Sequence, residues 1–452
     1  MADSSWLLER IESFGDQTAL HWRHRTLSYR ELRAEIEKSL MMLRKHAVKP
    51  GDVVGMRGDY SPATCAFLLA LIANQNIVVP LAPTVKTLDE FLSIAEVKVL
   101  FHFADSKLVS IEHRAAETSH PLIGELQQRG APGLILFSSG STGKSKASLL
   151  DFDKFLKKFQ RQRPGARTLT FLLLDHIGGI NTLMHVLTSG GTIVPVDERT
   201  PAAVCKAIEQ HRIQLLPTTP TFLNMLLISE VYRSHDLSSL ELITYGTEPM
   251  PSSTLRHLHE VFPKVQLKQT YGLSELGILQ TKSKDSESLW VKVGGDGYQL
   301  KVVDGVLWVK AESAMLGYLN APSPFDQDGW FNTGDAVEVD GEYMKILGRK
   351  SELINVGGEK VYPAEVESVL LQLPNVRDVT VVGRPNPITG QVVVARITLQ
   401  EPEELSAVVR RMRSFCSGRL APYKVPVAVD LVEGQLHGDR FKKARSSTST
   451  LA

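Results

Sequence analysis

The sequence predicts an α/β protein made of two domains. Short apolar strands alternate with helical patterns along most of the chain, which favours parallel sheets with crossover helices. From about Val293 the pattern changes to β-hairpins, and a small α+β segment follows Arg349. We therefore expect a large N-terminal domain of parallel-rich sheets with crossover helices plus a β-hairpin region, over residues 1–348, and a small α+β C-terminal domain over residues 349–452.

The N-terminal elements follow from local patterns. The segment MADSSWLLERIESF predicts an amphipathic helix, and it lacks the basic start and apolar core of a signal peptide. Ser28 opens a helix through Leu43, and a turn at 49–52 leads into the strand VVGMRG. Residues 61–73 predict a buried helix, and IVVPL predicts a buried strand. The same alternation continues through the strands TFLLL, GTIVPV, IQLLPT and LELITYG.

Two Asp-Gly pairs mark the hairpin region. Asp304-Gly305 separates YQLKVV from VLWVK, and Asp340-Gly341 separates VEV from EYMKILG. Asp-Gly between alternating apolar residues favours a two-residue hairpin turn. In the C-terminal domain, helices are expected near 363–373 and 403–417, with strands near DVTVVG and VVVARITL.

The bulk composition excludes several classes of protein. The chain has 452 residues, 43% of them hydrophobic, and 51 basic against 50 acidic side chains, so its formal net charge is +1. Nothing in this balance attracts the whole molecule to nucleic acid or to an anionic membrane. The three cysteines are far apart and form no metal-like pair, and the most apolar run, CAFLLALIA, is too short to span a bilayer. These features predict a cytoplasmic protein with reduced cysteines.

The stretch FSSGSTGKSKAS, residues 137–148, has the composition of a phosphate-binding loop. It is not a Walker A loop, because Ser138 occupies the position of the first glycine and the residues after Lys144 look extended rather than helical. We expect the apolar strand GLILF before the loop and a helix that begins near Asp151 or Asp153 and runs through KFLKKFQRQR. The alternative is an ordinary Gly/Ser surface loop.

Four further segments combine polar or aromatic side chains with glycines. They are YGTEP at 245–249, QTYGLSE at 269–275, GWFNTGD at 329–335 and DHIGG at 175–179. Three of them follow predicted strands, and ligands bind at the carboxyl ends of parallel strands. A tyrosine ring can lie against a base, and a carboxylate can hold Mg²⁺ or two ribose hydroxyls. Each segment also has a plain structural reading, such as a β-to-α loop, a capping serine, a turn-forming aspartate or a packed histidine.

Together and in this order, these segments resemble the adenylate-forming superfamily, which includes acyl- and aryl-CoA ligases, the adenylation domains of nonribosomal peptide synthetases, and firefly luciferase. The resemblance runs from about Leu27 to about Arg445. It is nearest to the stand-alone acyl- or aryl-CoA ligases. It implies ATP, Mg²⁺ and CoA, or a phosphopantetheine arm, as ligands, and a C-terminal domain that is mobile.

The resemblance also implies a role for each matching residue. The phosphates of ATP would be enclosed by Ser138, Ser139, Gly140, Ser141, Thr142, Gly143 and Lys144. Adenine would stack on Tyr271, with Gly246, Thr247 and Gly272 in the same nucleotide site. Ser274 would contact phosphate or carboxylate oxygens, and Glu275 would hold Mg²⁺. Asp335 and Arg349 would bind ribose. Lys350-Ser351 would be the hinge, and Gly357 and Gly358 would face the pantetheine thiol in the second step.

Two positions depart from the family pattern. The hinge position holds Ser351 where the family has Asp or Lys. The C-terminal Gly-Lys pair is replaced by Gly438-Asp439. Lys442 is the favoured source of the amine that neutralises charge during adenylation, with Lys443 as the alternative. The plain reading is that both are solvated tail lysines.

The predicted reaction is the attack of a carboxylate on the α-phosphate of ATP, followed by transfer of the acyl group to a thiol, most simply CoA. DHIGGINTLMHVL is closer to the His-Gly-Gly pattern of acyl- and aryl-acid ligases than to that of amino-acid-activating relatives. We expect an aryl or medium apolar acid near His176, Gly178, Thr218 and Tyr245. The alternatives are loading of a carrier protein, amide formation with an amine, and a non-catalytic nucleotide-binding relative.

Overall fold

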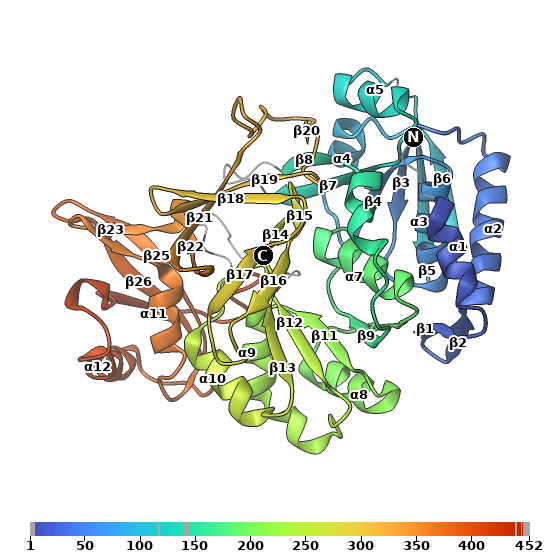
Figure 1. Ribbon diagram of the computed structural model, residues 1–452. Helices are drawn as coiled ribbons and strands as arrows, with labels where there is room; N and C mark the ends of the chain where they lie inside the picture. Colours follow the sequence, from blue (N-terminus) through green and yellow to red (C-terminus); the bar gives the residue numbers. More distant parts are fainter. Residues whose placement is uncertain (1–4, 116–117, 140–144, 439–440, 444, 446–452) are drawn as a thin grey trace.

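The computed structural model describes residues 5–115, 118–139, 145–438, 441–443 and 445, and it has the expected α/β architecture (Figure 1). Two seven-stranded sheets form most of the N-terminal part. The first has the order β13 (Gln266–Gln269), β12 (Leu242–Tyr245), β11 (Leu215–Thr218), β9 (Arg167–Thr170), β10 (Thr192–Pro195), β1 (Thr18–Trp22) and β2 (Arg25–Ser28). The second has the order β20 (Gly317–Tyr318), β8 (Ser145–Asp151), β7 (Gly133–Ser139), β4 (Ile77–Leu81), β3 (Val53–Arg57), β5 (Val99–Ala104) and β6 (Lys107–His113).

The first sheet decides where the site lies. Its strands from β13 to β1 are all parallel, and only β2 at the edge is antiparallel. The carboxyl ends of β9, β11, β12 and β13 therefore meet at one edge. The loops that leave this edge begin at Phe171, Thr219, Gly246 and Thr270. Three of the segments that the sequence singled out are thus gathered at one place, as expected for an open α/β sheet.

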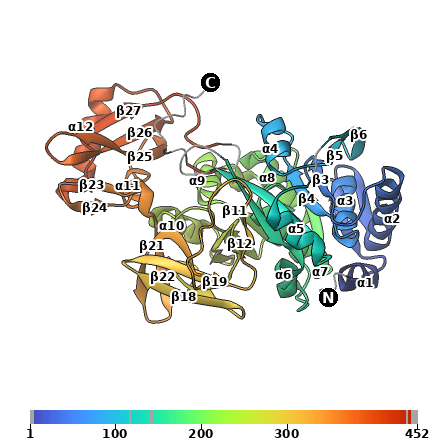
Figure 2. The ribbon, with the colours of Figure 1, turned by 90° about the horizontal axis from the view of Figure 1, so that it is seen from above.

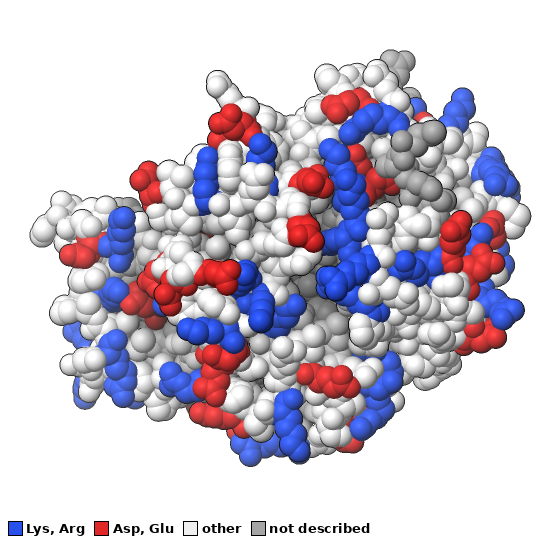
Figure 3. Space-filling model, viewed as in Figure 1, with Lys and Arg blue, Asp and Glu red and all other residues white. Residues whose placement is uncertain are grey.

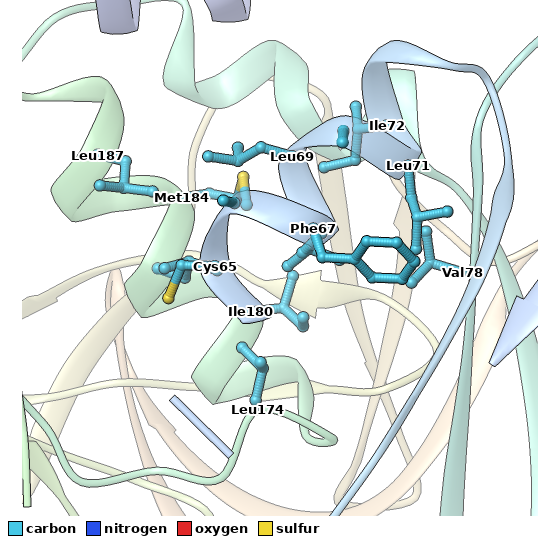
Figure 4. Close-up of a cluster of buried hydrophobic side chains, with 14 of the residues drawn as sticks. Cys65, Phe67, Leu69, Leu71, Ile72, Val78, Leu174, Ile180, Met184 and Leu187 are labelled. Carbon is cyan, nitrogen blue, oxygen red and sulfur yellow. The ribbon is translucent and has the colours of Figure 1, made fainter. Parts of the chain in front are cut away.

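The helices cover both faces of these sheets. They are α1 (Ser5–Ser13), α2 (Tyr29–Lys45), α3 (Pro62–Ala73), α4 (Leu88–Ile94), α5 (Pro121–Gln128), α6 (Phe152–Leu156), α7 (Ile177–Thr188), α8 (Pro201–His211), α9 (Pro220–Ser229) and α10 (Ser252–Val261). Capping boxes at Ser28 and Ser61 begin α2 and α3 as the sequence predicted. Apolar side chains of α3 pack against those of α7 in one buried cluster (Figure 4), which fixes α7 in place below the strand ends.

The FSSGSTGKSKAS segment is a hairpin and not a strand-to-helix loop. β7 and β8 pair antiparallel, with Ser138 opposite Lys146 and Ser139 opposite Ser145. The expected strand before the loop and the extended segment after it are therefore both confirmed. Residues 140–144, which hold the predicted phosphate contacts Gly140, Ser141, Thr142, Gly143 and Lys144, lie outside the described residues.

The hairpin region forms a six-stranded antiparallel sheet that carries the ribose residues. Its order is β16 (Gln280–Ser283), β17 (Trp290–Gly294), β22 (Tyr343–Arg349), β21 (Phe331–Asp340), β19 (Val306–Ala311) and β18 (Tyr298–Val303). Asp304-Gly305 forms the predicted two-residue turn, since Val303 pairs with Val306. The second hairpin is shifted by one residue, because Asp340 itself pairs with Tyr343.

The C-terminal part is a small α+β unit with its own hydrophobic cluster. Its sheet has the order β24 (Glu359–Val361), β23 (Ile354–Val356), β26 (Gly390–Leu399) and β25 (Val376–Asn386), and β27 (Ala428–Leu431) pairs with β26. The helices α11 (Pro363–Leu370) and α12 (Leu405–Cys416) pack on this sheet. Figure 2 shows the unit at one end of the molecule, with α11 turned toward α10.

Two local predictions were wrong in extent, and one alternative interpretation, a helix-capping Ser274, is excluded. The strand TFLLL ends at Thr170, so most of that segment is loop, because the chain must turn there to begin α7. The helix after β8 stops at Leu156 and continues only as the 3-10 turn η1 (Lys157–Phe159). Residues 272–278 form the short hairpin of β14 (Gly272–Leu273) and β15 (Gly277–Ile278), so Ser274 sits in a hairpin turn and caps no helix.

Candidate active site

The ribose residues form one hydrogen-bonded network around the buried carboxylate of Asp335. Asp335 on β21 lies directly opposite Arg349 on β22 in the hairpin register. Arg349 Nε approaches Asp335 Oδ1 at 2.8 Å, and the Tyr271 hydroxyl donates to Asp335 Oδ2 at 2.7 Å. Thr333 fixes the aspartate further, because its hydroxyl accepts the Asp335 backbone N–H at 3.0 Å and donates to the Leu307 carbonyl. The predicted adenine and ribose residues are therefore in direct contact.

Burial shapes the charge of this network. Asp335 is only 6% exposed. Burial raises its pKa above the ordinary value of 3.8, although the Arg349 guanidinium and the Tyr271 hydroxyl favour the ionised form. The Lys442 ammonium also acts to lower the pKa of Asp335, which places this C-terminal lysine beside the same site.

Glu275 is positioned by the hairpin that bears the predicted phosphate loop. β20 pairs with β8, which places Tyr318 opposite Ser148. The Tyr318 hydroxyl donates to Glu275 Oε1 at 2.6 Å, and the Lys146 ammonium lies 4.9 Å from the centre of the Tyr318 ring. Through Tyr318, the carboxylate of Glu275 is therefore held next to β8, the strand that follows residues 140–144. Ser274, its neighbour, is 9% exposed.

The segment YGTEP is shaped by close contact with the end of β13. A Cβ atom on Gly246 would lie 2.4 Å from Thr270 Oγ1, so only glycine fits without moving that residue. Thr247 has a positive φ of 74° and lines the same cavity as Lys442. Glu248 caps the start of α9, where it accepts from the Thr221 backbone N–H at 2.8 Å. The loop is thus rigidly held.

DHIGG begins α7 at the other side of the strand ends. His176 is the N-cap residue, and its Nδ1 accepts the Gly178 backbone N–H at 3.1 Å. A Cβ on Gly178 would lie 2.8 Å from a Leu172 methyl group. Thr218 Oγ1 is buried and has no hydrogen-bond partner within the described part of the chain. Tyr245 instead belongs to the hydrophobic cluster that the first sheet shares with α8, α9 and α10, so its role toward the acid stays a prediction.

The two C-terminal lysines face in opposite directions. Lys442 lines a cavity with His176 and Thr247. Lys443 points into the C-terminal unit, where its Nζ donates to the Val379 carbonyl at 2.5 Å and lies 3.3 Å from Asp378 Oδ1. The side chain of Lys443 is only 6% exposed, so it is no solvated tail residue. Of the two, Lys442 is the lysine that faces the predicted nucleotide site.

Phe441 anchors this segment in the N-terminal part. Its ring lies 5.1 Å from Phe171 and 5.7 Å from Phe222, and it stacks on His437 at 5.0 Å. The Lys443 backbone N–H also donates to Glu248 Oε2 at 3.3 Å. Phe441 and Glu248 were not predicted as functional: Phe441 is a single aromatic residue without a motif, and within YGTEP only Tyr245, Gly246 and Thr247 received a role. Asp439, the departure from the family pattern, lies outside the described residues.

The predicted thiol-side residues lie elsewhere. Gly357 and Gly358 form the turn between β23 and β24 with positive φ values of 63° and 95°. Figures 1 and 2 both place β23 at the far edge of the C-terminal unit, away from β7 and β8. Between the two parts, Lys350 and Ser351 lie in the 3-10 turn η3 (Lys350–Glu352) and are exposed.

Three residues that were not predicted as functional support the site. Tyr318 holds Glu275, and Thr333 holds Asp335. Asn320 contacts the start of β8, since it donates to the Ser145 carbonyl at 2.9 Å and accepts the Ala147 backbone N–H at 3.0 Å. Thr333 lies within the GWFNTGD segment, whereas Tyr318 and Asn320 act across large sequence separations, so no local pattern identifies those two.

Comparisons with known proteins agree with this geometry. A family model described as AMP-binding enzyme matches residues 7–319, and one described as AMP-binding enzyme C-terminal domain matches residues 365–442. The chain is 31% identical over 480 residues to an indoleacetate–CoA ligase of Aromatoleum aromaticum, covering 94% of this chain and 93% of the relative. A crystal structure of the anthranilate CoA ligase AuaEII with anthranoyl-AMP superposes with a TM-score of 0.83 at 22% identity, covering 97% and 95% of the two chains. The amide bond synthetase McbA of Marinactinospora thermotolerans gives a TM-score of 0.76 at 22% identity, covering 95% and 96%.

Within the described residues, no helix combines the length and apolar character needed to cross a membrane.

Proposed function

Because the chain belongs to the AMP-binding enzyme family, we propose that it is an AMP-forming acid–thiol ligase. It activates a carboxylic acid with ATP to an acyl-adenylate and transfers the acyl group to CoA. One observation carries the proposal: Tyr271 after β13, Asp335 on β21 and Arg349 on β22 form one network around the buried Asp335 carboxylate, beside Lys442.

The first step joins two anions, so positive charge must be supplied at the reacting atoms. A carboxylate oxygen of the acid attacks the α-phosphorus of ATP, and the bond to the bridging oxygen of pyrophosphate breaks. Lys442 reaches the site from the C-terminal segment and offsets the charge that builds up on the oxygens of the α-phosphate. Asp335 accepts the two ribose hydroxyls, while Arg349 and Tyr271 hold the aspartate in position.

The residues present fit a magnesium ion at the phosphates. Glu275 supplies one hard carboxylate oxygen, and Tyr318 occupies the other oxygen and fixes the group. Within the described ranges there is no group of three or more His, Cys, Asp and Glu side chains, so the other ligands would be phosphate oxygens and water. When bound, Mg²⁺ supplies charge neutralisation on the leaving pyrophosphate.

The second step needs a different arrangement of the C-terminal unit. Gly357 and Gly358 would have to approach the acyl-adenylate, and they lie far from it here. We propose that the unit rotates about Lys350 and Ser351, which are exposed and not part of either hydrophobic core. The thiolate of CoA then attacks the acyl carbonyl carbon, and AMP leaves with the bridging oxygen.

The acid is proposed to be an aryl acid. The relative with 31% identity is named for indoleacetate, and α7 begins with the His176-Ile177-Gly178-Gly179 segment that we expect to border the acid. The buried Thr218 hydroxyl, which has no partner among the described residues, offers a further polar contact.

A panel of carboxylic acids read by pyrophosphate release, with and without CoA, tests the proposal. Lys442→Ala should slow pyrophosphate release by about 100-fold, the cost of one charge-stabilising group, while thioester formation from a supplied acyl-adenylate changes little. Lys443→Ala is the matched control; it removes a buried ion pair and should lower the melting temperature instead. Absence of release with every acid would overturn the proposal. Mass spectrometry of the product with CoA, carrier protein or an amine present identifies the acceptor.

A further inference from the structure

A cluster of basic side chains lies beside α7, away from the nucleotide. Lys158 on η1 donates from Nζ to Asn181 Oδ1 at 2.6 Å and to the Ile278 carbonyl at 2.9 Å. His185 on α7 feels the charges of Lys158, of Lys268 on β13 and of Arg163. The exposed Arg163 also acts on both lysines, so it lies near both. Figure 3 shows Lys and Arg side chains gathered around a hollow over the region where Figure 1 places α7 and β16.

The charges of this cluster are not compensated by the protein. No carboxylate forms an ion pair with Lys158, Arg163 or Lys268 among the residues that the structure describes, and each is instead close to another cation. Burial, with Arg163 nearby, lowers the pKa of Lys158 from 10.5 to about 7. The same causes lower the pKa of Lys268, and burial with the three cations lowers the pKa of His185 to about 4. Like charges that lie close together and partly buried repel one another and lower the stability of the folded protein, unless an anion binds between them.

The basic cluster lies along the same helix, α7, whose N-terminus carries the residues that we expect to border the acid. Gly178, Asn181 and His185 are spaced three and four residues apart, so they follow one face of α7 away from His176 at its N-terminus. With a rise of about 1.5 Å per residue, Asn181 and His185 lie roughly 5 and 10 Å along the axis from Gly178. Lys268 is on the face of β13 opposite to Leu267, which packs toward α8, α9 and α10. The cluster therefore lies further along α7 from His176 and Gly178, the residues that we expect to border the acid.

We propose that the acid carries a second anionic group, such as a carboxylate, and that Lys158, Lys268 and Arg163 bind it beside Asn181 and His185, about 5–10 Å beyond Gly178 along α7. This inference rests on the proposed function and specifies its substrate as a dianionic aryl acid. Asn181 orients Lys158, and neutral His185 donates a hydrogen bond to the same anion.

A purely structural role explains only part of this arrangement. Lys158 alone is satisfied by Asn181, the Ile278 carbonyl and the rings of Phe155 and Phe159, each 4.9 Å away. Such a clamp does not explain why Arg163 acts on both Lys158 and Lys268 while no carboxylate pairs with any of the three among the described residues. Anionic charge is what the three have in common as a missing partner. The phosphates of ATP belong to the nucleotide site, so the second anionic candidate for this cluster is CoA, which also carries phosphate groups.

The test compares acids matched in size. Benzoate, phenylacetate and cinnamate are compared with their 4-carboxy derivatives and with the methyl esters of those second carboxylates, by the kcat/KM of pyrophosphate release without CoA. The best dicarboxylate should exceed its ester by about 10- to 100-fold, the range expected for charge-assisted hydrogen bonds. Lys158→Met should reduce this preference to near one. Lys157→Met, which alters the exposed neighbour that pairs with Glu312 at the surface, should leave it intact.

Binding provides a second readout. The dicarboxylate should raise the melting temperature of the wild-type protein in the presence of ATP and should have little effect on Lys158→Met. Lys268→Met repeats the test on a separate element if the first variant does not fold. Equal kcat/KM for dicarboxylate and ester in the wild type overturns the inference and leaves adenylation standing. A change confined to the KM for CoA also overturns it, and no release with any acid overturns the proposed function as well.

Discussion

Asp335 is the residue on which we propose that nucleotide binding depends most. Its carboxylate is buried, and it must be ionised to accept two ribose hydroxyls. Because burial raises its pKa above 3.8, the ionised form is complete only at higher pH than for an exposed aspartate. We therefore expect the KM for ATP to rise as the pH falls through this raised pKa, and Asp335→Asn to have a high KM with no such pH dependence. The KM measured from pyrophosphate release across pH checks this.

The free energy of unfolding gives the control, because Asp335 is expected to change it with pH in the direction opposite to its effect on ATP binding. The folded protein binds the Asp335 proton more tightly than the unfolded chain does, so Asp335 contributes less to the free energy of unfolding as pH rises through that interval. Asp335→Asn should therefore keep or raise the melting temperature at pH 7 while it weakens ATP binding. An unchanged KM for ATP in this variant would remove Asp335 from the ribose site.

At the scale of the element, the ends of β12 and β13 are held at one fixed separation. The Thr270 backbone N–H and hydroxyl both donate to the Tyr245 carbonyl, at 2.7 and 3.0 Å. A Cβ on Gly246 would meet that same hydroxyl, which cannot move without losing its bond. Gly246→Ala should thus displace Tyr271 and raise the KM for ATP by about tenfold, the effect of roughly 1.4 kcal/mol.

A second glycine serves as a control that distinguishes the steric effect at Gly246 from the general effect of replacing glycine by alanine. Gly124 lies in α5, and a Cβ there would meet nothing within 4 Å. Gly124→Ala should stabilise the protein by about 0.4–1 kcal/mol and leave the KM for ATP unchanged. Thermal unfolding and steady-state kinetics on both variants distinguish the two effects. Equal KM values for Gly246→Ala and Gly124→Ala would show that the close approach at Thr270 does not position Tyr271.

For the whole molecule, we propose that the contact between the two parts limits the reaction to its first step. Ser252 Oγ lies 3.0 Å from Ser368 Oγ, and Ser253 donates to the Ser368 carbonyl at 2.9 Å. A Ser252→Cys/Ser368→Cys pair should form a disulfide that locks this arrangement. The oxidised protein should release one burst of pyrophosphate and make no acyl-CoA, and reduction should restore turnover.

The native cysteines do not interfere with that experiment, because Cys65, Cys205 and Cys416 are all buried. Each single cysteine variant, treated with the same oxidant, serves as the matched control. Acyl-CoA formation at the wild-type rate by the fully oxidised pair would show that the second step needs no rotation about Lys350 and Ser351.

Much of the fold follows from local pattern. The strands IVVPL and GLILF, the caps Ser28 and Ser61 and the Asp304-Gly305 turn are where the sequence predicts them, since period, capping chemistry and turn chemistry act over a few residues. Errors of extent fall where tertiary packing ends an element early, as in the helix that stops at Leu156.

The sequence by itself determined the family, the order of the elements and the residue types available at the strand ends. Only the tertiary structure decided which of Lys442 and Lys443 faces the nucleotide site, that Tyr318 holds Glu275, and that Lys158 joins a cluster beside α7. The physical reason is that the Tyr318–Glu275 and Lys158–Ile278 contacts join residues 43 and 120 positions apart. The direction of a side chain across such separations is set by packing of whole elements, which no local pattern encodes.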